Sequence, residues 1–460
     1  MTKYTTQFIA EYITQKEIED FPLKVIEKAT YCILDSIGCM LAGIESKEGK
    51  ILTKSLKDTG LGSSSILGLK YKTSLINAVY INSMSANVLD FDDNYIGHPG
   101  ATIIPLALNL AELLGSTGEE LLTAIIVAYE ISIRIGQCLR SEEERKYILG
   151  HGTWQVFGSV SVASKLLKLK KKEIQNAFGI AGANAPVPSV MKTTYGLEGP
   201  SMAKNNFGTA VTTGLQSALL AKNGFTGPID IFDGDTAFWK MIGKKRNGIN
   251  DKLLKDCGKI FMISSVSFKF YPCCRLMHSS IDAVVDLIKK HDIDLNNIKK
   301  IILRSIKPLS RFPFTVKNPK NATDGRFSIP FTFACVLHEI DPLQWYSSEN
   351  INRVDLLKSA EKIEIENDCQ ADCIFKEDPK RIPSKISLYQ KDMTKYDCEK
   401  FIPRGNKLDF SEKMDLRDKF FKLASQIYTN PEKIKSLVKI ILKLNRKRNI
   451  NKLLDVFTSI

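Results

Sequence analysis

The hydrophobic pattern of this chain changes its period near Val266. Before that residue, apolar side chains recur at helical spacing, as in 118–135 and 208–223. After it, apolar and polar residues alternate in 361–366 and 385–390, which is typical of strands. A helical pattern cannot pack as a sheet, nor a strand pattern as a helix, so the two blocks must form different layers. The sequence therefore predicts a mainly α fold with a smaller α+β part.

The chain has 460 residues, which is too long for one hydrophobic core, so two domains are expected. Segment 299–305 is a further predicted strand. From Asp409 the helical pattern resumes, and we expect these last helices to pack on the first helical body. The prediction is a discontinuous all-α domain and a smaller α+β domain: residues 1–265 with 399–460, and residues 266–398.

Composition is that of a soluble globular protein, with 43% hydrophobic and 25% charged residues. No apolar run approaches the ~20 residues that a membrane helix needs. Residues 1–15 lack the apolar centre of a signal peptide. Among the ten cysteines, neither Cys273 with Cys274 nor Cys369 with Cys373 has the spacing of a zinc site. The sequence predicts a cytoplasmic protein with no metal and no membrane partner.

The net charge of +14 is concentrated in part in 433–452, where lysines and arginines follow an apolar helical pattern. A nucleic-acid interface would also need aromatic or base-reading groups, and none accompanies this stretch. We interpret it as a solvated helix face and expect no nucleic-acid partner, with nucleic-acid binding as the alternative. A basic surface near a cleft would instead attract anionic substrates.

A dense polar cluster occupies 90–99, between the helix-like apolar segments 74–89 and 103–114. It contains three carboxylates, the amide of Asn94 and the imidazole of His98. Glycine and proline residues within it interrupt any helix. We therefore expect these side chains on a helix end and a loop held by two buried helices, which is how a scaffold presents acid–base groups.

Two further polar residues precede predicted helices. His151 comes shortly before 157–169, where the positive end of the helix dipole keeps an imidazole neutral and able to accept a proton. A purely structural capping role is the alternative. Lys204 precedes 208–223, and a cation near a helix N-terminus is unfavourable unless an anion accompanies it.

The segment 268–278 lies at the predicted domain junction and contains a proline and two thiols, preceded by Lys269 and followed by Arg275 and His278. Small-molecule sites are common between domains. Cys274 beside these groups could also act as a thiolate nucleophile, although no Asn or Asp partner is identifiable. We favour a binding role for this segment.

Taken in order, five motifs resemble one family. They are LDFDD-x4-HPGA, GHGTWQVFGS, EGPSMAK, LLAKNGFTGPIDIFDG and K-x-YPCCR-x2-H. Together they resemble the MmgE/PrpD family, which includes 2-methylcitrate dehydratase, cis-aconitate decarboxylase and iminodisuccinate epimerase. The resemblance spans nearly the whole chain.

The resemblance implies a large helical domain built from both chain ends, a smaller α+β lid domain, a homodimer, and no metal or organic cofactor. It places the site between the domains. The residues that it implies as catalytic are Asp90, His98, His151, Lys204 and Lys269. The residues predicted to contact substrate are Asn94, Cys274, Arg275 and His278.

The expected substrate is a small di- or tricarboxylate, and the expected step is loss of a proton next to a carboxylate. The resulting carbanion needs fixed positive charge, which Lys204 and Lys269 would supply. His98 and His151 would act as acid and base, and Asp90 would orient a histidine or a lysine. Elimination of water is the expected outcome, with decarboxylation or epimerisation as alternatives.

The chain departs from the family pattern at Asn94, Phe207 and Cys274, where relatives often carry Thr, His and His. The YPCCR version of the motif is nearer to the epimerase-like branches than to the decarboxylases. A catalytically inactive family member that only binds carboxylates is a further alternative.

Overall fold

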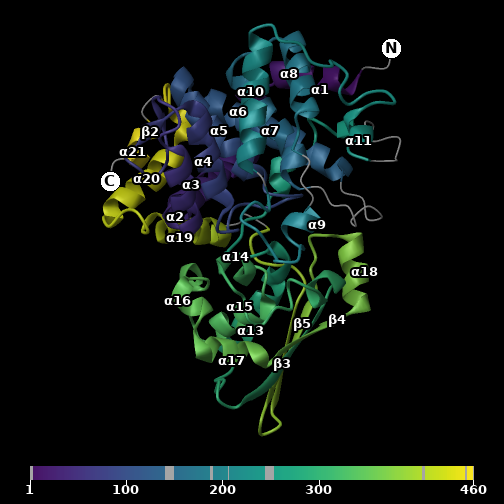
Figure 1. The fold of residues 1–460 in the computed structure, drawn as a ribbon, viewed down its shortest axis with the longest axis vertical. Helices are drawn as coiled ribbons and strands as arrows, with labels where there is room; N and C mark the ends of the chain where they lie inside the picture. The colour runs from purple at the N-terminus through teal and green to yellow at the C-terminus, as the bar shows by residue number, and fades with distance from the viewer. Residues whose placement is uncertain are drawn as a thin grey trace. The chain divides into compact units, whose positions relative to one another are not determined.

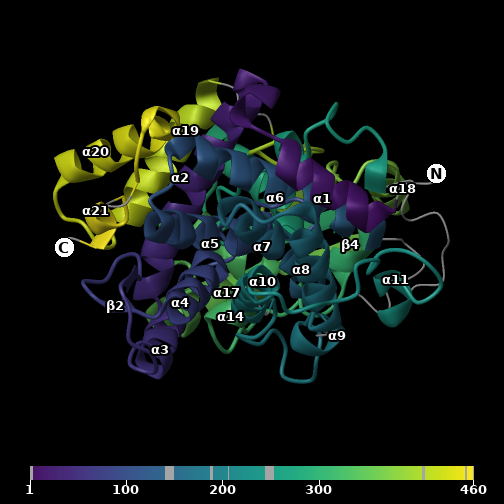
Figure 2. The same ribbon diagram turned by 90° about the horizontal axis from the view of Figure 1, so that it is seen from above.

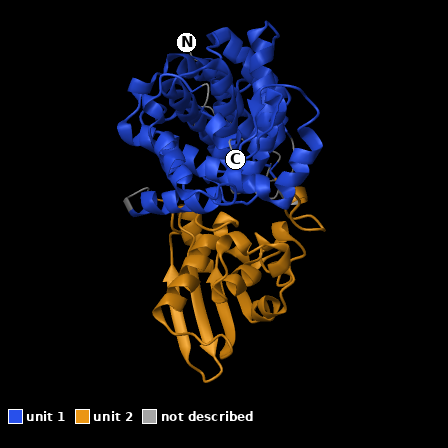
Figure 3. Cartoon of the chain, turned by 90° about the vertical axis from the view of Figure 1, so that its left-hand side faces the viewer, with its two compact units in different colours: residues 1–191, 205–267, 407–460 blue, residues 192–204, 268–406 orange. Residues whose placement is uncertain are grey.

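The computed structural model describes residues 4–139, 150–186, 190–205, 207–243, 253–406, 410–450 and 453–458 (Figure 1). Its contacts divide the chain into two units (Figure 3). Unit 1 comprises Met1–Met191, Asn205–Ser267 and Lys407–Ile460, and unit 2 comprises Lys192–Lys204 and Phe268–Asn406. The predicted mainly α fold class is confirmed. Segment 192–204, which the sequence pattern grouped with the helical region, belongs to unit 2.

Unit 1 is helical. Its helices are α1 (Thr5–Gln15), α2 (Leu23–Glu45), α3 (Lys47–Leu56), α4 (Leu75–Asn87), α5 (Pro99–Leu114), α6 (Gly118–Leu139), α7 (Gly152–Leu166), α8 (Lys171–Ala183), α10 (Phe207–Lys222), α11 (Phe238–Met241), α19 (Phe410–Ala424), α20 (Pro431–Leu442) and α21 (Asp455–Thr458). The short α9 (Val190–Thr193) lies at the boundary of the two units. Two antiparallel strands of two residues each, β1 (Ser64–Ser65) and β2 (Lys72–Thr73), precede α4.

Helix α7 packs against α5, α6, α8 and α10, which places it at the centre of unit 1. Small residues make this close packing possible. A Cβ added at Gly158 would lie 2.9 Å from the Cβ of Ser132 on α6, and one added at Gly214 of α10 only 2.4 Å from that of Ser159. The glycine and serine content of these helices therefore sets how closely they approach.

Helix α6 begins with a capping box. The Thr117 hydroxyl accepts from the Glu120 amide at 3.1 Å, and the Glu120 carboxylate accepts from the Thr117 amide at 2.9 Å. By length and composition α6 could cross a membrane, which corrects the expectation that no apolar run was that long. Its most apolar stretch of 18 residues is 89% buried within the protein, which is how the core helix of a large helical body behaves.

Helix α2 runs unbroken from Leu23 to Glu45, through Asp35 and Gly38. These two residues contribute to the packing of α2 against α19. Asp35 forms an ion pair with Lys419 of α19, and a Cβ at Gly38 would lie 3.1 Å from Leu423 Cδ1. Helices α19 and α20 both pack on α2 (Figure 2). The C-terminal helices thus belong to the body formed by the first part of the chain.

Helix α20 carries much of the basic stretch noted in the sequence. It buries Ile434, Leu437 and Ile441 and exposes Lys435 and Lys439, the pattern of an amphipathic surface helix. Residues 451 and 452 of that stretch lie outside the described residues.

Unit 2 contains a four-stranded sheet in the order β4-β3-β5-β6. Its strands are β3 (Ile298–Ser305), β4 (Ile363–Asn367), β5 (Ser384–Gln390) and β6 (Lys395–Lys400). Strand β3 pairs with β4 in parallel and with β5 antiparallel, and β5 pairs with β6 antiparallel. The three predicted strands, two of them predicted from alternation, are present as β3, β4 and β5, whereas β6 was not predicted.

The helices of unit 2 cover this sheet and one another. They are α13 (His278–Lys290), α14 (Ala322–Gly325), α15 (Ile329–Leu337), α16 (Ser348–Ile351), α17 (Val354–Glu361) and α18 (Cys369–Glu377). Helix α13 packs on β5 and β6, and α15 packs on α13 and α17. The buried core includes Ile301 and Leu303 of β3 and Phe331 of α15.

Candidate active site

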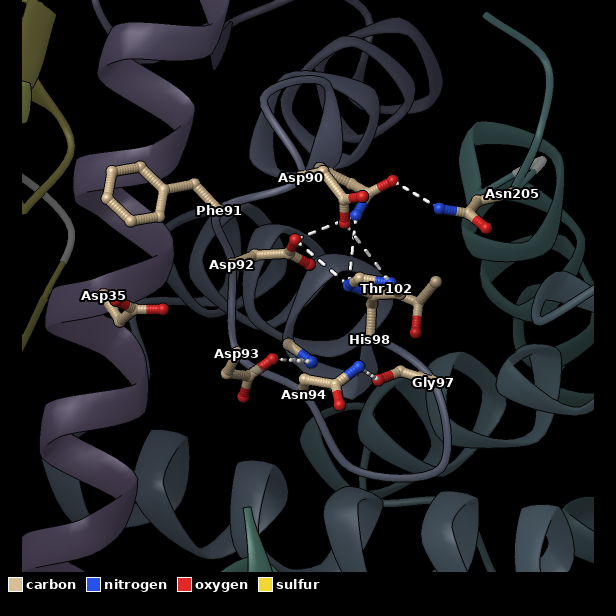
Figure 4. A network of polar contacts seen from close by, with 12 residues as sticks. Asp35, Asp90, Phe91, Asp92, Asp93, Asn94, Gly97, His98, Thr102 and Asn205 are labelled. Carbon is tan, nitrogen blue, oxygen red and sulfur yellow. Dashed lines mark hydrogen bonds and ion pairs between the residues drawn. The ribbon is translucent and has the colours of Figure 1, made fainter. Parts of the chain in front are cut away.

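The predicted polar cluster lies where α4 ends and α5 begins. Helix α4 ends at Asn87, His98 is the N-cap of α5, and Pro99 occupies the first helical position. Asp90 has a left-handed backbone with φ of 52°. In this turn the carboxylates of Asp90 and Asp92 face the imidazole of His98 (Figure 4). The placement expected from the sequence, a loop between two buried helices, is confirmed.

The His98 ring lies between two buried carboxylates. Its Nδ1 is 3.1 Å from Asp92 Oδ1, and its Nε2 is 3.8 Å from Asp90 Oδ1. An ionised carboxylate only accepts hydrogen bonds, so with Asp92 ionised the hydrogen is assigned to Nδ1, which then donates to Asp92. The lone pair is then on Nε2, the nitrogen on the Asp90 side. This tautomer leaves His98 ready to accept a proton.

Two amides hold this pair in place. The Asn87 amide donates to Asp92 Oδ1 at 2.8 Å and lies 3.2 Å from His98 Nδ1, while its oxygen accepts from Asn205 at 2.6 Å. The Gln155 side chain accepts from the His98 amide at 3.0 Å and donates to the His98 carbonyl at 2.6 Å. Gln155 thus fixes the backbone of His98 from α7.

Asp93 and Asn94 turn away from His98 and organise the loop. Asp93 accepts from the Gly100 amide at 3.0 Å and from the Tyr129 hydroxyl at 2.6 Å, and burial raises the pKa of Asp93 to about 7. The Asn94 side chain donates to the Gly97 carbonyl at 2.8 Å, and its backbone forms a bridge with Ser267. The predicted substrate contact of Asn94 stays a prediction.

His151 is the N-cap residue of α7, so the prediction that it precedes a helix is confirmed. Its ring centre is 5.5 Å from that of His98, at an angle of 65°. Trp154 lies 5.1 Å from His151, and Phe207 lies 5.8 Å from His98, again between ring centres. Unit 1 therefore brings two histidines together in a largely aromatic and carboxylate surrounding.

The other predicted residues belong to unit 2. Lys204 and Lys269 are buried, with 7% and 1% of their surface exposed. The Lys204 ammonium lies 5.3 Å from the centre of the Phe327 ring. Full burial of a lysine is unusual and requires compensating partners, which fits residues that serve more than solubility. Their catalytic assignment stays a prediction.

Arg275 makes hydrogen bonds that join separate segments of unit 2. Its guanidinium donates to the carbonyls of Phe268 at 3.2 Å and Arg404 at 2.7 Å, and to Asn406 Oδ1 at 3.1 Å. It also lies 3.3 Å from His278 Nδ1. These contacts give Arg275 a structural task that the sequence did not reveal. Cys274, whose neighbour it is, begins the turn before α13.

Within the described part of the chain, Asp90, Asp92 and His98 form the group whose geometry would admit a metal ion, with ligand atoms within 4.8 Å of one another. Two carboxylates and an imidazole are an acceptable donor set for several divalent ions. Asp92 and His98 already hydrogen-bond each other, however, which is the arrangement of an acid–base pair.

Sequence reasoning included Asp92 in the polar cluster without giving it a role of its own, and it missed the amides that support His98, which are Asn87, Gln155 and Asn205. Asp92 lies inside the LDFDD motif and was within reach of the motif argument. The amides carry no sequence signal of their own, because Asn87 lies in α4 and Gln155 in α7 and they meet His98 only through helix packing.

The fold and site define a class: a mainly α protein with an α+β part, whose helical body holds a carboxylate-bound histidine beside a second histidine. Comparison with known proteins gives the family. The family model of the MmgE/PrpD N-terminal domain matches residues 7–248, and the family model of the MmgE/PrpD C-terminal domain matches residues 271–443. The chain belongs to the MmgE/PrpD family.

Curated relatives are distant. A cis-aconitate decarboxylase of Aspergillus terreus is 23% identical over 98% of this chain and 95% of the relative. A probable 2-methylcitrate dehydratase of Saccharomyces cerevisiae is 23% identical over 96% and 91%. A 2-methylcitrate dehydratase of Escherichia coli is 26% identical over 48% and 47%. These names support an enzyme of the lyase class.

Proposed function

We propose that this protein is a cofactor-independent lyase that removes a proton next to a carboxylate of a small di- or tricarboxylate and expels water. The observation that carries the proposal is the pair of contacts at His98, with Asp92 on Nδ1 and Asp90 on the Nε2 side. A histidine held in this way is a general base, because the carboxylate on Nδ1 stabilises the imidazolium that forms.

In this mechanism Nε2 of His98 accepts the proton from the carbon, and the His98 cation is stabilised by Asp92. His151, whose ring centre lies 5.5 Å away, would enter this step as the imidazolium that an anionic substrate favours, and it donates its proton to the departing hydroxyl group, which leaves as water. Electrons from the broken C–H bond form the new double bond as the C–O bond breaks. The family resemblance extends the proposal to Lys204 and Lys269 as carboxylate-binding cations, and to a cytoplasmic homodimer.

A proton-exchange screen in deuterated water tests this proposal. Candidate di- and tricarboxylates are incubated with the protein and with an H98A variant, and deuterium incorporation and products are followed by NMR. Exchange with loss of water, absent in H98A, is the expected result. No exchange with any polycarboxylate by a folded protein would contradict it.

The same screen separates the alternatives. Decarboxylation is the second candidate, favoured by the fungal decarboxylase that aligns with 98% of this chain. It would release carbon dioxide. Epimerisation would give exchange with an isomer and no loss of mass, and an inactive binding protein would show ligand-induced shifts with no exchange.

A further inference from the structure

Helix α19 brings a buried lysine to the back of the polar cluster. Lys419 Nζ lies 2.6 Å from Asp35 Oδ1 on α2, and these side chains are 4% and 0% exposed. The same ammonium donates to the carbonyl oxygen of Phe91 at 2.6 Å. It also lies 4.0 Å from the centre of the Phe91 ring. One cation therefore holds both the backbone and the side chain of Phe91.

Phe91 is the residue between Asp90 and Asp92. Figure 4 shows its ring directed towards α2, while the flanking carboxylates point to His98. Asp90 has a left-handed φ of 52°, a conformation that persists only where the surroundings enforce it. A contact on the Phe91 carbonyl acts on the peptide bond to Asp92, so it can set where that carboxylate lies.

Docking of α19 alone does not require this pair. Lys413, on the same helix, pairs with Glu27 of α2 at 2.6 Å, and these side chains are 26% and 45% exposed. A buried pair pays a larger desolvation penalty than such a surface pair. The second oxygen of Asp35 has no hydrogen-bond partner, so the pair is also incompletely satisfied. What the buried pair adds is the contact with Phe91.

We propose that Lys419 is a positioning residue for His98. By fixing the Phe91 carbonyl, Lys419 holds Asp92 against His98 Nδ1 and thereby selects the tautomer with its lone pair on Nε2. Asp35 holds the Lys419 ammonium in turn. The kinetic consequence rests on the function proposed above, whereas the structural consequence at the imidazole does not.

The first test reads the tautomer directly. The chain has only five histidines, so the ring nitrogens can be assigned by substitution in 15N-labelled protein. We expect the native His98 to carry its hydrogen on Nδ1. K419M should give a mixture of tautomers, K419R should restore the native signal in part, and K413M should leave it unchanged.

A matched pair of variants controls for misfolding caused by an unpaired buried charge. D35N keeps the Lys419 donor to Phe91, and D35N/K419M removes that donor without leaving an unpaired buried charge. The tautomer should change further in D35N/K419M than in D35N. A native His98 signal in folded D35N/K419M or K419M would overturn the inference.

The second test is kinetic. K419M should lower kcat at least ten-fold with KM changed less than two-fold, and K413M should change neither. In an H98A background K419M should add less than two-fold, because Lys419 acts through His98. An undiminished effect in H98A would overturn the inference. Since the NMR test needs no substrate, a failed proton-exchange screen leaves this inference separately testable.

Discussion

Each unit contains a buried histidine at the start of a helix, and the two are held in opposite ways. His98 of unit 1 has the carboxylate of Asp92 on Nδ1. His278 of unit 2 has the guanidinium of Arg275 at 3.3 Å from Nδ1, and its Nε2 lies 3.3 Å from the Cys273 carbonyl. Since an arginine only donates, His278 must accept at Nδ1 and donate at Nε2.

The contrast shows how neighbours decide what an imidazole does. The carboxylate of Asp92 on Nδ1 gives His98 the arrangement on which the proposed proton transfer rests. A guanidinium on Nδ1 opposes protonation, so His278 suits a fixed hydrogen-bonded framework. The structure therefore supports chemistry at the first histidine and chain organisation at the second.

The largest expected effect separates these histidines. H98A and H151A should each lower turnover roughly 10²–10⁴-fold, the scale of a general acid or base, with little change in stability. H278A should reduce the melting temperature and cost less turnover than H98A. Steady-state kinetics and thermal unfolding check this. Equal losses of turnover in H98A and H278A would break the comparison.

Arg275 should matter for folding. R275M removes the charged donor that now serves the carbonyls of Phe268 and Arg404 and the side chain of Asn406, and a hydrogen bond to a charged group contributes about 1.5–3 kcal/mol. Urea unfolding followed through the fluorescence of Trp345, which is buried in unit 2, should show an earlier midpoint. An unchanged midpoint with lost substrate affinity would instead make Arg275 a substrate ligand.

The raised pKa of Asp93 predicts that the stability of the helical unit depends on pH. Burial raises its pKa from 3.8 to about 7, so between these values the folded state keeps a proton that the unfolded state has released. Stability from this group is present at low pH and falls as pH rises towards 7, by up to about 1.4 kcal/mol per pH unit. D93N should reduce this slope in denaturation curves measured from pH 4 to 7.5, and part of it should remain because burial also raises the pKa of Glu112 to about 7. An unchanged slope in D93N would contradict the prediction.

The lysines of unit 2 test whether that unit contributes charge to substrate binding. K204Q and K269Q should each lower kcat/KM about ten-fold, since a charge-assisted hydrogen bond is worth about 1.5–3 kcal/mol. Lys→Arg should restore activity only in part, because a planar fork replaces a point charge. Exposed Lys358 provides a control as K358Q. Unchanged dicarboxylate affinity in both variants would contradict the assignment.

The smallest expected effect is that of chelation. Although Asp90, Asp92 and His98 could admit an ion, we expect turnover to survive EDTA, because acid–base pairing of Asp92 with His98 suffices for the proposed step. Activity measured before and after dialysis against EDTA checks this. Loss of activity that one divalent ion restores would make the same cluster a metal site.

Sequence patterns predicted what local periodicity controls. The helical spacing in 118–135 and 208–223 corresponds to α6 and α10, and the loop position of His98 follows from glycine and proline. Strand β6 was missed because its sequence, KYDCEK, is polar and partly exposed along its length. It forms a strand through its antiparallel pairing with β5, which its own composition does not indicate.

The rest of the site depends on contacts distant in sequence. Gln155 forms two hydrogen bonds with the His98 backbone because α7 packs on α5, and the local sequence of neither helix predicts that contact. Asp35 and Gly38 resemble a helix break in sequence, yet they are where α19 packs on α2. Such residues are ambiguous until their partners are known.

The link between Lys419 and Phe91 spans 328 residues, which has a consequence for synthesis. At roughly 5–20 residues per second, a ribosome needs on the order of a minute or less to travel that distance. During that time the nascent chain already carries the loop with Asp90 and Asp92 but not the lysine that anchors it. The loop with Asp90 and Asp92 therefore leaves the ribosome well before its anchor, so the arrangement seen at His98 can be completed only after α19 has been synthesised.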